Sequence, residues 1–426
     1  MESFVLKGNV IHSLADGRLS ATKGYVVCTC GTSRGVFATL PTEYSHLPVV
    51  DHGERLIVPG LVDLHIHAPQ FALRGTRMDL ELIDWLNTTT FPQEARFADT
   101  TYAQKAYGQF VSTLRKSATT RACVWGTCHT DSTLLLMHAL EQSGLVTLVG
   151  RVNMDRFAPA PLVEETQRSI SETLRWLSAC HFERTHPILT PRFVPSCTDA
   201  LMCALDTVRQ DYRLPVQSHL SENMGEVEWV RSLRPDVAFY GQAYHKHHLF
   251  GKDSEGGTFP TVMAHCIHST PQEVALMVEN GVTVAHCPAS NANLSSGIAP
   301  IRHYLNQGVS VGLGTDVAAG ESESMFRAVV QCVQMSKLYW RLVDSTAAPL
   351  TFADAFRLAT RSGGAFFGKV GAFDEGFAFD ALVLDDSHLP TPEPLSAVER
   401  LERFAYLGGD TSGGIVTKYV EGTRLF

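Results

Sequence analysis

The sequence lacks several features that would point to membranes or nucleic acids. It contains no run of about 18 apolar residues, so it predicts no membrane-spanning helix. Basic residues are in the minority, with 35 Lys and Arg against 44 Asp and Glu, which argues against a nucleic-acid-binding surface. The first ten residues lack the basic-then-apolar pattern of a signal peptide and predict a β-strand. We therefore expect a cytoplasmic protein that binds neither nucleic acid nor membranes.

Cysteine pairs with metal-binding spacing are also absent. Ten cysteines are scattered along the chain with no Cys-x-x-Cys pair, and Cys28 and Cys30 are the closest together. Without a secretion signal, they are most simply reduced, mostly buried thiols. Internal repeats and low-complexity linkers are missing as well. The 426 residues, 44% of them hydrophobic, can form one large core with a smaller appendage.

The order of apolar segments predicts the fold class, which is α/β. Up to about Ile57 the chain contains only short β-like pieces, but after His67 strand-length apolar segments alternate with longer helical ones. Eight such strands, each followed by a helix, predict a (β/α)8 TIM-type barrel. We expect the barrel to span residues 58–371, with residues 1–57 and 372–426 together forming a small β-sandwich domain. The predicted barrel strands are 61–67, 120–127, 145–154, 187–194, 214–220, 261–266, 282–287 and 309–315.

The first barrel strand ends in His65 and His67. Residues two apart on a strand point to the same face, so these imidazoles project together. Two imidazoles aimed at one point are half of a divalent metal site. The alternative is an ordinary pair of strand histidines. Active sites of such barrels lie at the carboxyl ends of the strands, and later strands end in the groups that a metal site still needs. These later residues are His219, His265, His286 and Asp316.

The predicted metal ligands are His65, His67, His219 and Asp316, which give three neutral donors and one charge. A metal held this way lowers the pKa of a bound water toward neutrality. Glu222, three residues beyond His219, is the predicted proton-transfer group, although a glutamate at a helix start is also stabilised by the helix dipole. His265 is expected to face the developing oxyanion or the leaving group.

Other histidines and cysteines near these strand ends are given lesser roles. His268 could be mistaken for the catalytic histidine, but His265 lies at the end of its strand. His286 either hydrogen-bonds a ligand or fills the end of strand seven. Cys266 and Cys287 are expected to point to the opposite face of their strands. The histidine-rich run at residues 245–248 is predicted to be a solvated loop.

These motifs resemble the amidohydrolase superfamily. The resemblance rests on Pro59-Gly60-Leu61-Val62-Asp63-Leu64-His65-Ile66-His67, His219-Leu220-Ser221-Glu222, His265 and Gly314-Thr315-Asp316. Binuclear members carry a metal-bridging lysine at the end of strand four, whereas Leu189–Phe193 here contains none. The resemblance therefore implies a single Zn2+ per chain, although the same ligands accept Fe2+. It also suggests a homodimer.

Within the superfamily the chain is similar to the members that deaminate guanine. The shared residues are Ala68-Pro69-Gln70, Asp84-Trp85-Leu86, Thr90-Phe91-Pro92, Pro191-Arg192-Phe193, His219–Asn223, His286–Asn291 and Thr315–Ala318. The resemblance implies that guanine is hydrolysed to xanthine and ammonia, with Glu222, His265 and Asp316 handling protons. It further implies that Gln70 and Arg192 hydrogen-bond the purine, with Trp85 and Phe193 beside it.

Three alternatives remain at this point. Arg192 could form a structural salt bridge, Gln70 could cap a backbone group, and the two aromatic side chains could simply pack in the core. The substrate could be another aminated ring, such as a pterin, a triazine or an adenosine derivative. A non-catalytic scaffold is the third possibility, although such members usually lose metal ligands.

Overall fold

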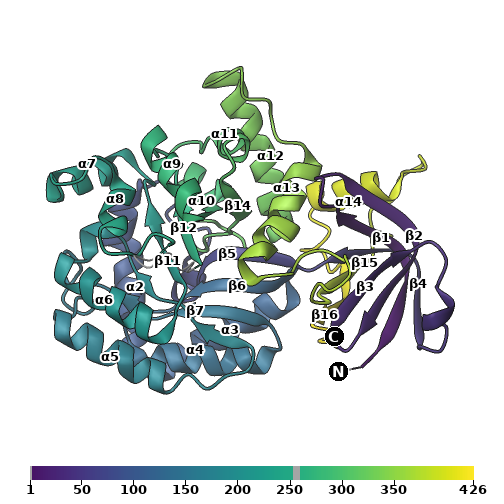
Figure 1. The fold of residues 1–426 in the computed structure, drawn as a ribbon, viewed down its shortest axis with the longest axis horizontal. Helices are drawn as coiled ribbons and strands as arrows, with labels where there is room; N and C mark the ends of the chain where they lie inside the picture. The colour runs from purple at the N-terminus through teal and green to yellow at the C-terminus, as the bar shows by residue number, and fades with distance from the viewer. Residues whose placement is uncertain (1, 253–259) are drawn as a thin grey trace.

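A computed structural model of the chain describes residues 2–252 and 260–426. Two bodies lie side by side in Figure 1: a large α/β part and a smaller β part that contains both chain ends. None of the helices described there is long and apolar enough to cross a membrane.

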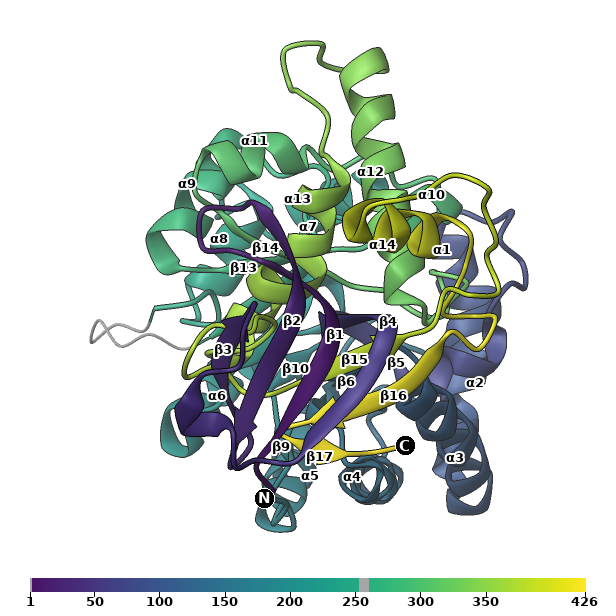
Figure 2. The same cartoon turned by 90° about the vertical axis from the view of Figure 1, so that its right-hand side faces the viewer.

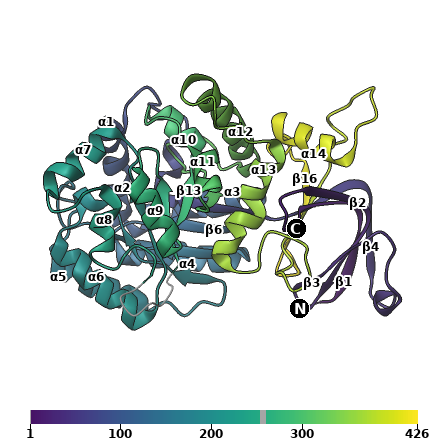
Figure 3. The ribbon, with the colours of Figure 1, turned by 45° about the horizontal axis from the view of Figure 1, so that its top comes forward.

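The smaller part is built on one seven-stranded sheet from both ends of the chain, as predicted. The strand order is β17-β16-β15-β4-β1-β2-β3. The sheet curls strongly (Figures 2 and 3). Two strands separate β1 from β16, yet the rings of Phe4 on β1 and Tyr419 on β16 lie only 5.1 Å apart. The strands are β1 Phe4–Ser13, β2 Leu19–Thr29, β3 Thr32–Phe37, β4 Val49–Pro59, β15 Ala381–Leu384, β16 Ile415–Val420 and β17 Thr423–Arg424.

The larger part contains two parallel four-stranded sheets, in the orders β5-β6-β7-β9 and β11-β12-β13-β14. Backbone hydrogen bonds join them at both edges: Gln217 N donates to Leu189 O at 2.9 Å, and Asp316 N donates to His65 O at 2.7 Å. The strands are β5 Leu61–His67, β6 Thr119–Trp125, β7 Val146–Gly150, β9 Thr185–Pro187, β11 Val216–Leu220, β12 Thr261–His265, β13 Thr283–His286 and β14 Ser310–Leu313.

Helices follow the parallel strands and cover their outer faces (Figures 1 and 3). Their buried sides carry the apolar residues, as in α3, where Tyr107, Phe110 and Leu114 face the core. The longer helices are α3 Thr100–Lys116, α4 Thr130–Ser143, α5 Thr166–Ser178, α6 Asp199–Tyr212, α7 Met224–Leu233, α9 Pro271–Asn280, α12 Met325–Leu342 and α14 Ala397–Tyr406. The shorter ones are α1 Leu82–Trp85, α2 Phe91–Ala95, α8 Tyr240–His245, α10 Pro288–Asn293, α11 Ile301–Asn306 and α13 Phe352–Arg357.

Two predicted strands are interrupted in the structure. Within the segment predicted as 187–194, only Pro187, the last residue of β9, and the short β10 Thr190–Pro191 are strand, and proline has no N–H to donate to a ladder. The segment predicted as 145–154 is divided into β7 and β8 Val152–Asn153, which pairs with β10. Residue Arg151 lies at this break, and its buried guanidinium bonds Thr130 Oγ1 at 2.9 Å.

Candidate metal centre and substrate pocket

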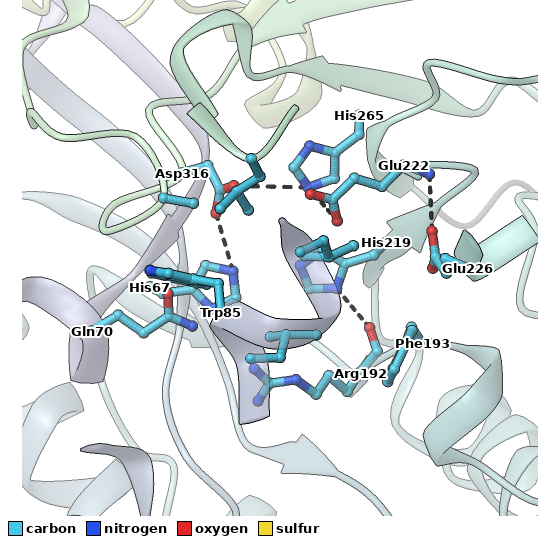
Figure 4. A pocket seen from close by; sticks show the side chains of 14 residues that line it. His67, Gln70, Trp85, Arg192, Phe193, His219, Glu222, Glu226, His265 and Asp316 are labelled. Carbon is cyan, nitrogen blue, oxygen red and sulfur yellow. Dashed lines mark hydrogen bonds and ion pairs between the residues drawn. The ribbon is translucent and has the colours of Figure 1, made fainter. Parts of the chain in front are cut away.

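The carboxyl ends of β5 and β11 and the segment after β14 bring the four predicted metal ligands together. Figure 4 shows three of them, His67, His219 and Asp316. His65 Nε2 and His67 Nε2 lie 3.1 Å apart, and Asp316 Oδ1 lies 3.2 and 3.3 Å from them. The ligand atoms of His65, His67 and His219 all lie within 4.8 Å of one another. His65, His67 and Asp316 are almost fully buried, and His219 is partly buried.

Hydrogen bonds orient the imidazole of His219. Its Nδ1 lies 2.7 Å from the backbone oxygen of Arg192, an acceptor, so Nδ1 carries the proton and Nε2 keeps its lone pair. Burial holds the pKa of His67 and of His219 well below the ordinary value, and the neighbouring His65 adds to this effect. Neutral imidazoles are the form that binds a metal.

The spacing of these donors fits a tetrahedral ion. Zinc bonds of about 2.0–2.1 Å place neighbouring ligand atoms about 3.3 Å apart in a tetrahedron. The distances of 3.1, 3.2 and 3.3 Å among His65, His67 and Asp316 match that edge. Imidazole nitrogens and a carboxylate oxygen are also the ligand types that zinc accepts in catalytic sites. The residues present therefore suit one divalent metal ion.

Asp63 fixes two of the ligand-bearing strand ends relative to each other. Its carboxylate accepts hydrogen bonds from His65 N at 3.1 Å, Thr315 N at 3.0 Å and Thr315 Oγ1 at 2.6 Å. Because the side chain is fully buried, its pKa is raised to about 6. Asp63 belongs to the motif around His65 and His67, but no role had been predicted for it.

Trp125, at the end of β6, forms an aromatic wall behind the ligands. Its ring centroid lies 5.3 Å from that of His65, 4.8 Å from His67 and 4.4 Å from His219. The indole is fully buried, so it limits water access to this side of the cluster. Sequence reasoning missed this residue, because a tryptophan in a buried strand is indistinguishable from core packing.

Glu222 and His265 face each other on the other side of the cluster (Figure 4). Glu222 Oε2 lies 3.4 Å from His265 Nε2, and His265 Nδ1 donates to Asn291 Oδ1 at 2.9 Å. Burial raises the pKa of Glu222 well above its usual value, and Asp316 nearby raises it further. Burial lowers the pKa of His265 to about 4. A carboxylate with a raised pKa is suited to taking and returning a proton near neutral pH.

One pocket adjoins the cluster and collects the predicted substrate-binding residues. Gln70, Trp85, Arg192 and Phe193 all line it, together with His67, His219, Glu222, Glu226, His265 and Asp316. Apolar side chains complete the wall: Leu82, Leu86, Leu294 and Ala319. A pocket that combines apolar walls with convergent polar groups is typical of a site for a small molecule.

Glu94, on α2, ties the two polar residues of this pocket together. Arg192 Nη1 donates to Glu94 Oε2 at 2.5 Å and Nη2 donates to Oε1 at 3.1 Å. Gln70 Nε2 donates to the same Oε1 at 2.9 Å. All three side chains are buried. The salt bridge considered as an alternative for Arg192 therefore exists, but at the pocket wall. No sequence motif had indicated Glu94.

The other histidines considered above lie away from the pocket lining. His268 Nε2 donates to Ser296 O at 2.7 Å, and His286 is fully buried with its pKa lowered to about 3 by burial and by His265. The thiols of Cys266 and Cys287 are buried.

The prediction of a solvated loop at residues 245–248 is correct only in part, since residues 246–248 form a turn with Lys246 exposed. His245 ends α8, and His247 is only 9% exposed. Its Nδ1 lies 3.2 Å from Cys203 Sγ, and His248 Nδ1 lies 2.9 Å from Asp206 Oδ2. These partners lie on α6, far away in sequence, so a local pattern could not reveal them.

Comparisons with known proteins agree with this arrangement. A model of the amidohydrolase family matches residues 56–423. The crystal structure of a guanine deaminase from C. acetobutylicum, with guanine bound in its active site, is 43% identical, with a TM-score of 0.95 and complete coverage of both chains. Guanine deaminase from Mus musculus is 36% identical over 99% of this chain and 96% of its own length. Guanine deaminase from Dictyostelium discoideum is 32% identical over 99% of this chain and 98% of its own length.

Proposed function

The chain belongs to the amidohydrolase family, and on that premise we propose that it hydrolyses guanine to xanthine and ammonia. The observation that carries this proposal is the 43% identity, at a TM-score of 0.95 over the full chain, to a guanine deaminase with guanine bound. Since that similarity extends over the whole chain, it includes every element that forms the pocket.

Gln70 and Arg192 hydrogen-bond the purine, and hydrogen bonds to Glu94 fix the positions of both side chains. Arg192 uses one hydrogen on each terminal nitrogen for Glu94, which leaves further donors in its fixed, planar fork for the carbonyl and ring nitrogens of guanine. Phe193 and Trp85 supply apolar surface for the flat ring. These contacts orient guanine so that its amino-bearing carbon faces His67, Glu222 and Asp316.

Glu222 moves the protons that the reaction requires. Water adds to the amino-bearing carbon, and the carboxylate of Glu222 accepts a proton from that water and returns it to a ring nitrogen. His265 Nε2 lies 3.4 Å from Glu222 Oε2 and 3.8 Å from Asp316 Oδ2. His265 and Asp316 help to move a proton to the departing ammonia. Glu222, His265 and Asp316 are almost fully buried, which limits the exchange of their protons with bulk water.

His65, His67, His219 and Asp316 would hold one Zn2+ per chain, and the same donors accept Fe2+. When bound, such a metal polarises water and lowers its pKa toward neutrality. The buried, neutral imidazoles and the oriented Nδ1 of His219 support this ligand set.

The finer architecture is also a proposal. We propose that the two parallel sheets, bonded at both edges, close as a (β/α)8 barrel over residues 58–371. The curl of the seven-stranded sheet supports a two-layered, sandwich-like domain made from residues 1–57 and 372–426. A homodimer rests on the family resemblance alone, and a cytoplasmic location rests on the sequence features described above. Light scattering coupled to size-exclusion chromatography tests the dimer.

A substrate panel tests the reaction. Metal-loaded protein is incubated separately with guanine, a pterin, an aminated triazine and adenosine, and ammonia release is measured. We expect guanine to have by far the highest kcat/KM. Efficient turnover of another ring with guanine left unchanged would overturn the proposal. No ammonia from any of them, with metal bound, would favour a non-catalytic scaffold.

A further inference from the structure

Glu226, on the first turn of α7, is a buried carboxylate beside Glu222 that the reaction scheme above does not use. Its Oε2 accepts a hydrogen bond from the backbone N–H of Glu222 at 2.9 Å and a longer one from Asn223 N at 3.5 Å. Its Oε1 accepts a hydrogen bond from the hydroxyl of Tyr240 at 2.6 Å. Glu226 also lines the pocket (Figure 4).

The bond between Glu226 and Asn223 belongs to a capping box at the start of α7. A cap of this kind does not require burial. The same box at the start of α14 uses Glu399 on an exposed surface, where its carboxylate bonds Ser396 N at 2.8 Å. Glu226, in contrast, is 1% exposed, and burial raises its pKa to about 7. Placing a carboxylate there costs free energy that helix capping alone does not explain.

Helix α8 supports the same turn from behind. The ring centroids of Tyr240 and Tyr244 are 5.9 Å apart, and the rings are nearly parallel. Tyr244 donates its hydroxyl hydrogen to the backbone oxygen of His219 at 2.9 Å, while Tyr240 bonds Glu226. The two tyrosines therefore hold both ends of the segment that carries the metal ligand His219 and the proton-transfer residue Glu222.

Glu222 itself is held mainly through its backbone. Residue Ser221, just before it, has a left-handed φ of +47°, which is unfavourable for a residue with a side chain. The Ser221 hydroxyl is bonded to Glu273 Oε2 at 2.8 Å. The hydrogen bond from Glu222 N to Glu226 is the next fixed point along this tight turn, and it sets the direction in which the Glu222 side chain leaves the backbone.

We propose that Glu226, held in place by Tyr240, is a positioning residue that fixes the Glu222 carboxylate against the substrate ring. This inference rests on the proposed function, because it assumes that Glu222 transfers protons in the reaction. Glu226 acts through the backbone of Glu222 and not on the substrate. Its loss displaces the proton-transfer group while Gln70 and Arg192 continue to bind the purine.

Two variants separate positioning from helix capping. E226A removes the contact to Glu222, whereas N223A removes the other half of the capping box, in which the Asn223 side chain accepts from the backbone N–H groups of Gly225 and Glu226. We expect E226A to lower kcat on guanine about 10- to 100-fold with little change in KM, since small misplacements of a reacting group cost about this much. N223A should retain nearly native kcat even where its melting temperature falls.

Two further variants guard against misfolding of E226A. In E226Q the amide oxygen still accepts from Glu222 N and the amide N–H can donate to the Tyr240 oxygen, so most of kcat should return. Y240F removes the hydroxyl that holds Glu226, and we expect an intermediate loss of kcat. Metal content, measured on each protein, should equal that of the native chain.

Equal losses of kcat in E226A and N223A, or native kcat in both E226A and Y240F, would overturn the positioning role. A loss confined to KM would also contradict it. These outcomes differ from failure of the proposed function, which would appear as an unmodified, metal-loaded protein that leaves guanine unchanged.

Discussion

Among single residues, Glu94 is expected to contribute to guanine binding, and this contribution can be measured. Its carboxylate is shared by Arg192 and Gln70, so E94Q removes the charge that holds the guanidinium. A hydrogen bond to a charged group is worth about 1.5–3 kcal/mol, which corresponds to about 10- to 100-fold in binding. We expect the KM for guanine to rise by that factor, with a smaller change in kcat, in steady-state kinetics.

A second buried ion pair provides the control for E94Q. Glu164 bonds the buried guanidinium of Arg151, and neither residue lines the pocket. E164Q should therefore lower the melting temperature without changing KM. Equal effects of both substitutions on KM would show that the change at residue 94 acts through general destabilisation.

The pH profile depends on Glu222. Burial and the nearby charge of Asp316 raise its pKa above the ordinary 4.5, and the group must be ionised to accept a proton. As the pH falls through this raised pKa, Glu222 becomes protonated and kcat/KM should decline. We expect the acidic limb of kcat/KM for guanine to lie well above pH 4.5. A rate that stays constant down to pH 4.5 would contradict this role.

Residues at strand ends were predictable, whereas their supports were not. His65, His67, His219 and Asp316 end apolar strands, and the carboxyl ends of parallel strands meet at one face. Glu94 and Glu226 lie on helices, and Trp125 ends β6 but resembles a core residue. The Asn223-x-x-Glu226 spacing is a local capping pattern, whereas the contacts of Glu94, of Trp125 and of Glu226 with Tyr240 have no local pattern in the sequence.

At the scale of elements, Lys418 on β16 connects the small sheet to helix α3. Its Nζ donates to Leu114 O at 3.4 Å, Arg115 O at 3.0 Å and Ser117 O at 2.9 Å, at the carboxyl end of the helix. K418M removes these donors and leaves buried carbonyls without them, so we expect a loss of about 2 kcal/mol in the free energy of unfolding.

Denaturant unfolding measures that loss. The control is K7M, which removes an exposed pair with Asp51 and should leave stability unchanged. The KM for guanine should stay native in both variants, since neither residue lines the pocket. If K418M and the native protein had the same denaturant midpoint of unfolding, the free energy needed to bury the Lys418 side chain would equal the free energy gained from its hydrogen bonds.

The alternation of strands and helices could be predicted because parallel strands, buried on both faces, are continuously apolar. The residues at which individual strands begin and end could not be predicted. Predicted strand 187–194 retains only Pro187 of β9 and the two residues of β10, and predicted strand 145–154 is divided into β7 and β8. Local backbone chemistry shortened these elements within the predicted order.

At the scale of the whole molecule, metal binding should be coupled to stability. The ligands come from β5, β11 and the segment after β14, which belong to both parallel sheets, and the folded state alone brings them together. A ligand that binds only the folded state stabilises it by mass action. Dialysis against a chelator should lower the melting temperature and abolish deamination, and Zn2+ should restore both. An unchanged melting temperature would argue against this site.

The deamination of guanine through Glu222 is tested most directly by following guanine, xanthine and ammonia together in one reaction, with metal-loaded native protein and with E222Q. We expect equal amounts of xanthine and ammonia from guanine. In E222Q, kcat should fall about 10²- to 10⁴-fold with metal content unchanged. A metal-replete native protein that forms no xanthine, or an E222Q variant as fast as the native chain, would contradict deamination through Glu222.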